Sequence, residues 1–139
     1  MEAHQASISH LKIIDDDGDS LVTTALDRSM KVWTNTESEN GEYTLERKIF
    51  KHSEGFENIE VSFDQKFVVS QGKGNNHLSI WGVDPDSGDY LPAYTVHESN
   101  GGYEDIQCSY DNRIVVAKQV VGPVLLFGLK ESSGKFKLS

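Results

Sequence analysis

The sequence has little cysteine and no long apolar run. The single cysteine among 139 residues, Cys108, excludes an internal disulfide framework and fits a reducing compartment. No stretch approaches the roughly 20 apolar residues that span a membrane, and no basic segment followed by an apolar block marks a signal peptide. We therefore expect one domain, residues 1–139, in an intracellular and most simply cytoplasmic location.

Basic residues are also scarce. Lysine and arginine number 13 against 22 aspartate and glutamate residues, so the net charge is 13 − 22 = −9. A chain of this charge is repelled by phosphate groups. Nucleic acid and membranes are therefore not expected as partners.

The chain contains an internal repeat of 45 to 48 residues. A histidine returns after 48 and 45 residues, and an aromatic residue returns after 48 and 46. Chance rarely keeps several positions in phase, so the repeat is interpreted as a structural unit. Its markers are His4, His52 and His97, together with Trp33, Trp81 and Phe127.

Each unit is expected to form four β-strands. Short segments rich in β-branched and aromatic residues alternate with Gly, Asp and Asn turns, and no amphipathic helix is visible. The first strand follows each histidine, the third ends at the aromatic marker, and the fourth follows a long polar turn. The expected second strands are 21–23, 67–69 and 114–116, the third strands are 30–33, 78–81 and 124–127, and the complete fourth strands are 43–50 and 90–96.

Four-stranded units of this length, with a Trp closing the third strand, are typical of β-propellers. Residues 21–33, Leu-Val-Thr-Thr-Ala-Leu-Asp-Arg-Ser-Met-Lys-Val-Trp, resemble the WD40 repeat, with Asp27 six residues before Trp33. The resemblance implies an all-β fold, a β-propeller arc of three four-stranded antiparallel blades. The blades would cover about 4–50, 52–96 and 97–139, and the last would be incomplete.

In the WD40 family, a His, a Ser or Thr, an Asp and a Trp form a hydrogen-bonded structural tetrad inside a blade. The resemblance implies a complete tetrad in the first unit and a second one in which Asn replaces Asp. The third unit keeps only the histidine. The tetrad residues would be His4, Thr23, Asp27 and Trp33, and then His52, Ser70, Asn75 and Trp81.

Two patterns point to chemistry but favour a structural interpretation. His4, Thr23 and Asp27 form an acid–base set, yet inside a blade they would tie a loop to a strand. Residues 15–19, Asp-Asp-Asp-Gly-Asp, begin like a calcium-binding loop, but the twelfth position is Leu26 instead of Glu and no helix flanks the segment. We therefore expect no catalytic residue, no metal and no cofactor.

The two loop faces of the propeller are expected to differ in charge. The resemblance implies protein or peptide binding on these faces. One face is formed by the turns between second and third strands together with the connections from one unit to the next, and its candidates are Leu26, Arg28, Lys73, Asn76 and Tyr103. The opposite face would carry 13 of the 22 carboxylates and would steer a basic partner towards it. The alternative is that these turns are simply solvated. The acidic candidates are Asp15, Asp16, Asp17 and Asp19.

Three blades do not close a ring, because propellers are built from roughly four to eight. The arc leaves two apolar sheet faces uncovered. Other blades, a second copy of the chain or another protein would cover them. The leading function is a non-catalytic protein–protein interaction scaffold of WD40 type. The alternatives are a structural subunit or fragment completed by another polypeptide and, less favoured, an enzyme using an axial pocket.

Overall fold

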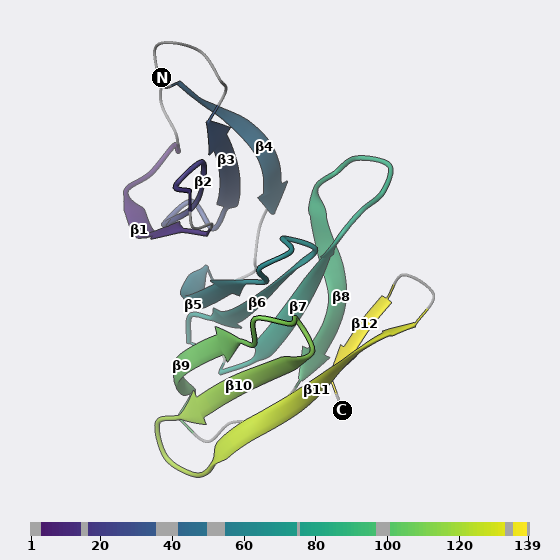
Figure 1. Cartoon of the computed structure of the whole chain (residues 1–139). Helices are drawn as coiled ribbons and strands as arrows, with labels where there is room; N and C mark the ends of the chain where they lie inside the picture. Colours follow the sequence, from purple (N-terminus) through teal and green to yellow (C-terminus); the bar gives the residue numbers. More distant parts are fainter. Residues whose placement is uncertain are drawn as a thin grey trace.

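A computed structural model describes residues 4–14, 17–35, 42–49, 55–74, 76–96, 101–132 and 135–138. Within these ranges the regular structure is β, in twelve strands that form three four-stranded sheets (Figure 1). Neighbouring strands are antiparallel and follow chain order within each sheet. The predicted all-β, three-sheet architecture is confirmed. None of the described residues forms a helix long and apolar enough to cross a membrane.

The strand bounds follow the predicted repeat closely. The first sheet contains β1 (Ile8–Ile13), β2 (Ser20–Ala25), β3 (Met30–Asn35) and β4 (Tyr43–Ile49). The second contains β5 (Phe56–Val61), β6 (Phe67–Gly72), β7 (Leu78–Val83) and β8 (Tyr90–Val96). The third contains β9 (Tyr103–Cys108), β10 (Ile114–Gln119), β11 (Val124–Ser132) and β12 (Lys135–Leu138).

The last strand is short, as the sequence predicts. β12 has four residues, whereas β4 and β8 have seven each. β11 is longer than predicted, because it continues to Ser132 and pairs with β12 from Leu129 to Ser132. β12 also lies beside β7 and β8 (Figure 1).

The turn between first and second strands is built in the same way in the second and third sheets. Ser62 Oγ donates to Asp64 Oδ1 at 2.7 Å, and 47 residues later Ser109 Oγ donates to Asp111 Oδ1 at 2.6 Å. Each aspartate also accepts the backbone N–H two residues further on, at 3.1 Å. Such side-chain to backbone bonds favour turns over continued strands. The repeat therefore recurs at the level of single hydrogen bonds.

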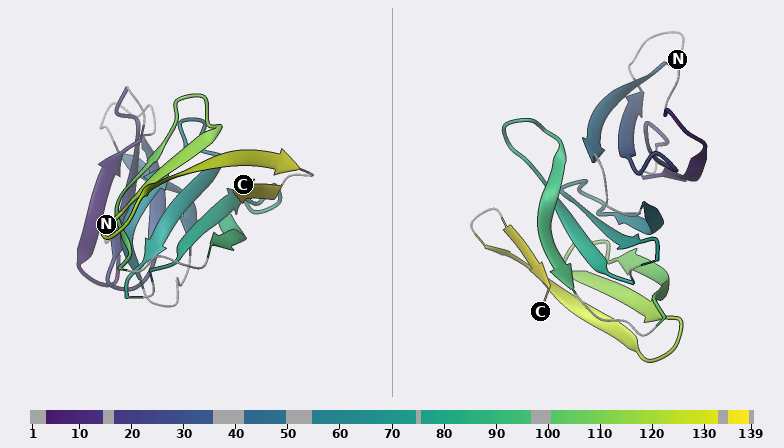
Figure 2. Two further views of the ribbon diagram at one scale, coloured as in Figure 1. Left: turned by 90° about the horizontal axis from the view of Figure 1, so that it is seen from below. Right: turned by 180° about the vertical axis from the view of Figure 1, so that it is seen from behind.

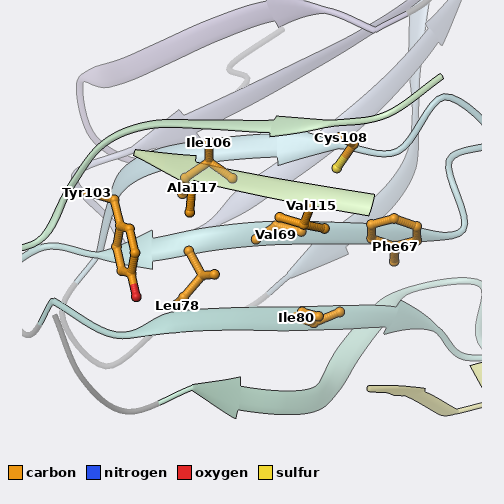
Figure 3. Packing of buried hydrophobic residues seen from close by; sticks show 9 residues of the cluster. All are labelled: Phe67, Val69, Leu78, Ile80, Tyr103, Ile106, Cys108, Val115 and Ala117. Carbon is orange, nitrogen blue, oxygen red and sulfur yellow. The ribbon is translucent and has the colours of Figure 1, made fainter. Parts of the chain in front are cut away.

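The three sheets pack side by side, with β1, β5 and β9 along one edge of the arc (Figures 1 and 2). One hydrophobic cluster joins the first and second sheets and includes Val22, Val32, Phe56 and Trp81. A second cluster joins the second and third sheets and includes Phe67, Val69, Leu78, Ile80, Tyr103, Ile106, Cys108, Val115 and Ala117 (Figure 3). An ion pair between Lys12 of β1 and Glu60 of β5 links the first two sheets near that edge.

The alternation of side chains along each strand explains this packing. Residues opposite one another in antiparallel strands point to the same face. Val69 lies opposite Ile80, and this pair faces the third sheet. Val68 lies opposite Trp81, and this pair faces the first sheet. Both faces of the middle sheet are thus buried, and all six residues of β6 are buried.

Candidate functional site

The structure brings His4, Thr23, Asp27 and Trp33 into one chain of hydrogen bonds. Trp33 Nε1 donates to Thr23 Oγ1 at 2.9 Å, and Thr23 Oγ1 lies 2.6 Å from His4 Nε2. On the other side of the ring, His4 Nδ1 lies 2.8 Å from Ser29 Oγ and 3.5 Å from Asp27 Oδ2. Ser29 Oγ in turn donates to Asp27 Oδ1 at 2.6 Å.

These contacts fix the direction of each donor. Because Ser29 Oγ gives its proton to Asp27, it must accept from His4 Nδ1. His4 Nε2 is then free to accept the hydroxyl proton of Thr23, whose oxygen accepts from Trp33. Ser29 is a member that sequence analysis missed. Its position two residues after Asp27, a spacing that favours local side-chain bonding, is the available signal.

The electrostatics of this network fit a structural role. Burial lowers the pKa of His4, against the opposing effect of nearby Asp27. Burial alone would raise the pKa of Asp27, but hydrogen bonds from Ser29 and from the backbone N–H of Gln5 hold it below its usual value. His4 and Thr23 are both buried, and each polar atom of the pair is engaged. The network ties the N-terminal segment to β2 and β3.

The second tetrad is described only in part. Trp81 Nε1 donates to Ser70 Oγ at 2.8 Å, in the geometry of Trp33 and Thr23. His52 and Asn75 lie outside the described residues.

Three of the predicted partner-binding residues line one cavity. It has a volume of about 410 Å³ and lies between the first and second sheets, on the face of the β2–β3 and β6–β7 turns. Leu26 and Arg28 come from the first turn and Lys73 from the second. The remaining lining residues are Ser9, His10, Ala25, Gly55, Phe56 and Glu57.

The other two candidates on this face lie elsewhere. Tyr103 is only 2% exposed and packs in the cluster between the second and third sheets (Figure 3). Its side chain therefore belongs to the core, which corrects the expectation that it contacts a partner. Asn76 is half-buried, adopts a left-handed φ of 55° and is not part of the cavity lining.

No family model matches the sequence. The chain is similar to the small ribosomal subunit protein RACK1 of Brassica napus, a distant WD40 homologue, with 26% identity over 83 residues that cover 60% of this chain and 25% of that protein. Its structure is similar to the Swd1 β-propeller domain of Myceliophthora thermophila, with a TM-score of 0.71, 15% identity, and coverage of 88% of this chain and 41% of that one. A structure described as a 6-phosphogluconolactonase of Bacteroides uniformis also has a TM-score of 0.71, with 14% identity and coverage of 100% and 40%.

The chain forms an arc of a WD40-like β-propeller. It spans about a quarter of the length of the curated relative and about two fifths of the propeller structures that it resembles. At these identities the solved structures show the fold alone.

The opposite loop face, where the β5–β6 and β9–β10 turns lie, carries an aromatic pair that sequence analysis missed. Phe63 and Tyr110 follow β5 and β9, are 48% and 76% exposed, and have ring centroids 4.8 Å apart. Asp17 and Asp19 are exposed on their turn, while Asp15 and Asp16 lie outside the described residues. In the described ranges, no group of three or more His, Cys, Asp or Glu residues has the arrangement of a metal site.

At both ends of the WD40-like arc, the part of the chain that the structure describes leaves apolar side chains of the outer sheet exposed. Three residues of β1 are exposed: Ile8, Leu11 and Ile13. The equivalent residues of β5 in the second sheet pack against the first sheet, and these are Phe56, Ile59 and Val61. At the other end, the exposed residues on the outer face of the third sheet occupy positions that are buried in the second sheet. These residues are Ile114, Val124 and Leu126, equivalent to Phe67, Leu78 and Ile80.

Proposed function

We propose that the chain is a non-catalytic scaffold that binds proteins or peptides on the loop face carrying Leu26, Arg28 and Lys73. The observation that supports this proposal is the cavity between the first and second sheets, whose lining includes these three exposed side chains. Rigid sheets that hold loops in place are a common basis for binding surfaces. The same cavity lies on the face that the WD40 resemblance implies for partners.

Affinity capture with the 139-residue chain tests this role. Proteins retained by the wild type are compared with those retained by Leu26→Asp and by Lys66→Gln, a surface substitution in the β5–β6 turn of the opposite face. The proposal expects a set of proteins that is lost with Leu26→Asp and kept with Lys66→Gln. Identical sets for all three chains would contradict it, provided that thermal melting shows all three to be folded.

A second candidate role is supported by the uncovered ends. The chain would then be a structural unit whose end sheets are completed by further blades, within the same protein or from another chain. We favour completion by other blades, with pairing of two copies into a six-bladed ring as the next possibility. This role differs from the first because substitutions at the ends, and not on the loop face, would remove the partner.

The alternative to a non-catalytic role is an enzyme that uses a pocket on the propeller axis, and we propose that the chain is not such an enzyme. Strand residues that would face such a pocket include His10, Lys12, Glu57 and Glu60, and the last of these is ion-paired to Lys12. The lactonase named among the similar structures shares the fold at 14% identity, which carries no activity to this chain. An assay of lactone hydrolysis by the purified chain is expected to give the rate of buffer alone.

We also propose an intracellular, cytoplasmic location. The free Cys108 thiol is buried in the core between the second and third sheets, as a reducing compartment allows. Fractionation of cells expressing the tagged protein tests this location.

A further inference from the structure

We propose that Phe63 and Tyr110 form a second interaction surface, which binds a proline of an extended partner segment. We call this pair the aromatic surface. It lies on the loop face opposite the cavity, so the inference goes beyond the proposed scaffold site and does not depend on it. Three features support it: two exposed rings held in fixed positions, a balance of charge around them, and turns whose backbone donors are already occupied.

The two rings of the aromatic surface occupy equivalent positions in the β5–β6 and β9–β10 turns. Each ring follows the serine and precedes the aspartate that are hydrogen-bonded to each other in its turn. The ring centroids are 4.8 Å apart and the ring planes are inclined at 49°. The pair therefore presents two adjoining aromatic faces that come from different sheets.

Most of the aromatic surface remains in contact with water. Tyr110 is 76% exposed and Phe63 is 48% exposed. Since Tyr110 buries so little of its area, folding gains little from this side chain. Adjacent exposed aromatic residues are instead typical of interaction sites, where they supply much of the binding energy.

A hydrogen bond between the two turns holds the rings relative to each other. Phe63 N–H donates to Asn112 Oδ1 at 2.8 Å. Asn112 has a left-handed φ of 58°, and Gln65, at the equivalent place in the other turn, has a φ of 57°. Non-glycine residues rarely adopt this conformation unless the turn fixes it. Rings on fixed turns lose less entropy when a partner binds.

The charges beside the aromatic surface cancel within its two turns. One turn carries Asp64 and Lys66, and the other carries Asp111 and Arg113. Hydrogen bonds from Ser109 and from the Arg113 backbone lower the pKa of Asp111, so this carboxylate is ionised near neutral pH. The other charged residues that the structure describes in the turns of this face are acidic: Asp17, Asp19, Glu42, Asp84, Asp86 and Asp89.

This distribution favours an uncharged group on the rings. The surrounding acidic turns disfavour an anionic partner. A cationic side chain on the rings would meet the positive charges of Lys66 and Arg113 as well as the two aspartates, so it gains little from the local charge. Binding would then depend on the apolar area of the rings.

The backbone of the two turns offers few donors to a partner. Five of its N–H groups donate to acceptors of the same two turns: those of Phe63, Gln65, Lys66, Asn112 and Arg113. A partner strand would need such donors in order to pair with the chain. Proline does not, because extended proline segments form no ladder and leave their carbonyls open to solvent.

Proline also suits the shape of the aromatic surface. Its compact ring packs on an exposed aromatic face, and its fixed φ lowers the entropy lost on binding. The Tyr110 hydroxyl can donate to a carbonyl of the same segment. Exposed rings, balanced charge and occupied donors thus point to the same ligand.

Fluorescence anisotropy with short labelled peptides tests this inference. The probes share the sequence Gly-Ser-X-X-X-Ser-Gly, where X is proline, alanine, leucine or lysine, and the protein is the full 139-residue chain. We expect the proline probe to bind roughly twofold to tenfold more tightly than the alanine probe, the range for a contact with an aromatic ring. We also expect it to bind more tightly than the leucine and lysine probes.

Variants of the aromatic surface locate the effect. Tyr110→Ala and Phe63→Ala are expected to abolish the preference for proline. Tyr110→Phe keeps the ring and is expected to lose less affinity than Tyr110→Ala. Val121→Ser is the matched control, because it removes an apolar side chain that is 69% exposed in the β10–β11 turn of the other loop face. Thermal melting of each variant establishes that it is folded.

Several results would overturn the inference. Equal binding of the proline and alanine probes, or no binding by any probe, would remove the site. Tighter binding of the leucine or the lysine probe would replace the proposed ligand by a general apolar or a cationic one. A proline preference that Tyr110→Ala leaves unchanged would place the binding elsewhere. None of these results bears on the scaffold function, which is tested by Leu26→Asp on the other face.

Discussion

Leu126 occupies in the third sheet the place that Ile80 occupies in the second, yet Leu126 is 67% exposed and Ile80 is fully buried. The difference is that Ile80 faces the third sheet, whereas none of the described residues covers Leu126. The same contrast holds at the opposite end between Leu11, 63% exposed, and Ile59, which packs in the first cluster. The same kind of sheet-to-sheet contact thus occurs twice inside the arc, and the equivalent surfaces at its two ends are exposed.

Thr23→Val should lower the free energy of unfolding by about 1–3 kcal/mol, the cost of leaving buried polar groups without partners. The substitution keeps the shape of the side chain but removes the hydroxyl that joins Trp33 Nε1 to His4 Nε2. Chemical denaturation measures the change. Thr44→Val is the control, because its hydroxyl is exposed and makes only a 3.4 Å contact with the Thr34 carbonyl. If the two substitutions lowered the free energy of unfolding equally, the hydrogen-bond network would not be a source of stability.

Stability should fall as the pH falls from neutral into the acid range. Burial lowers the pKa of His4 in the folded state below its ordinary value of 6.5, so the unfolded chain takes up the proton first. The stability due to neutral His4 is therefore complete above about pH 6.5 and is lost as the pH falls towards the folded-state pKa. Protonation of Nε2 would also deprive the Thr23 hydroxyl of its acceptor.

Melting temperature as a function of pH measures this effect. His4→Gln should give a flatter profile between about pH 7 and pH 5, because it has no ionisable ring. Asp27 adds a second loss of stability at lower pH, below its ordinary value of 3.8, because hydrogen bonds from Ser29 lower its pKa in the folded state. A wild-type profile that is flat from neutral pH to pH 5 would contradict the proposed His4 linkage.

Gly102→Ala should destabilise the protein more than Gly74→Ala. Both glycines have left-handed φ angles, 81° and 85°, so both substitutions add backbone strain of about 1–2 kcal/mol. A Cβ at Gly102 would also lie 2.5 Å from Gln71 Nε2 and 2.8 Å from Asn76 Oδ1, whereas nothing lies within 4 Å at Gly74. Gln71 is buried, and its Oε1 accepts from Asn58 Nδ2 and from the backbone N–H of Tyr103. Equal melting temperatures for the two variants would show that this close packing is absent.

Cys108 should react slowly with a thiol reagent in the native state. Burial raises the pKa of its thiol to about 12, so little thiolate is present near neutral pH, and the side chain is shielded by Val115 and its neighbours. Absorbance assays with an aromatic disulfide reagent should show one thiol reacting only after denaturant is added. Rapid reaction of the native chain would indicate that the second and third sheets do not pack as described.

The sequence was sufficient to predict the strands, because β-branched and aromatic residues are concentrated in short segments and Asp, Asn or Gly residues lie in the turns between them. Ser29 could not be predicted as a link between His4 and Asp27, since its role depends on the turn that brings its hydroxyl between them. Tyr103 was assigned to the loop face because it begins a strand next to a turn. Its side chain instead points into the second sheet, where Leu78 and Val69 bury it.

The cavity was predictable only in part. Leu26, Arg28 and Lys73 were assigned to one face from their equivalent turns, but the contribution of Phe56 and Glu57 depends on how closely the first two sheets approach. That approach is set by side chains packed across the interface, such as Val32 and Trp81, which no local pattern describes.

The mass of the purified chain in solution, measured by light scattering, tests most directly the claim that the arc has two open ends. We expect species larger than the 15.5 kDa monomer, or association with further blades, and we expect Leu126→Asp to reduce this association without unfolding the protein. A soluble wild-type chain that remains a 15.5 kDa monomer at all concentrations would contradict it.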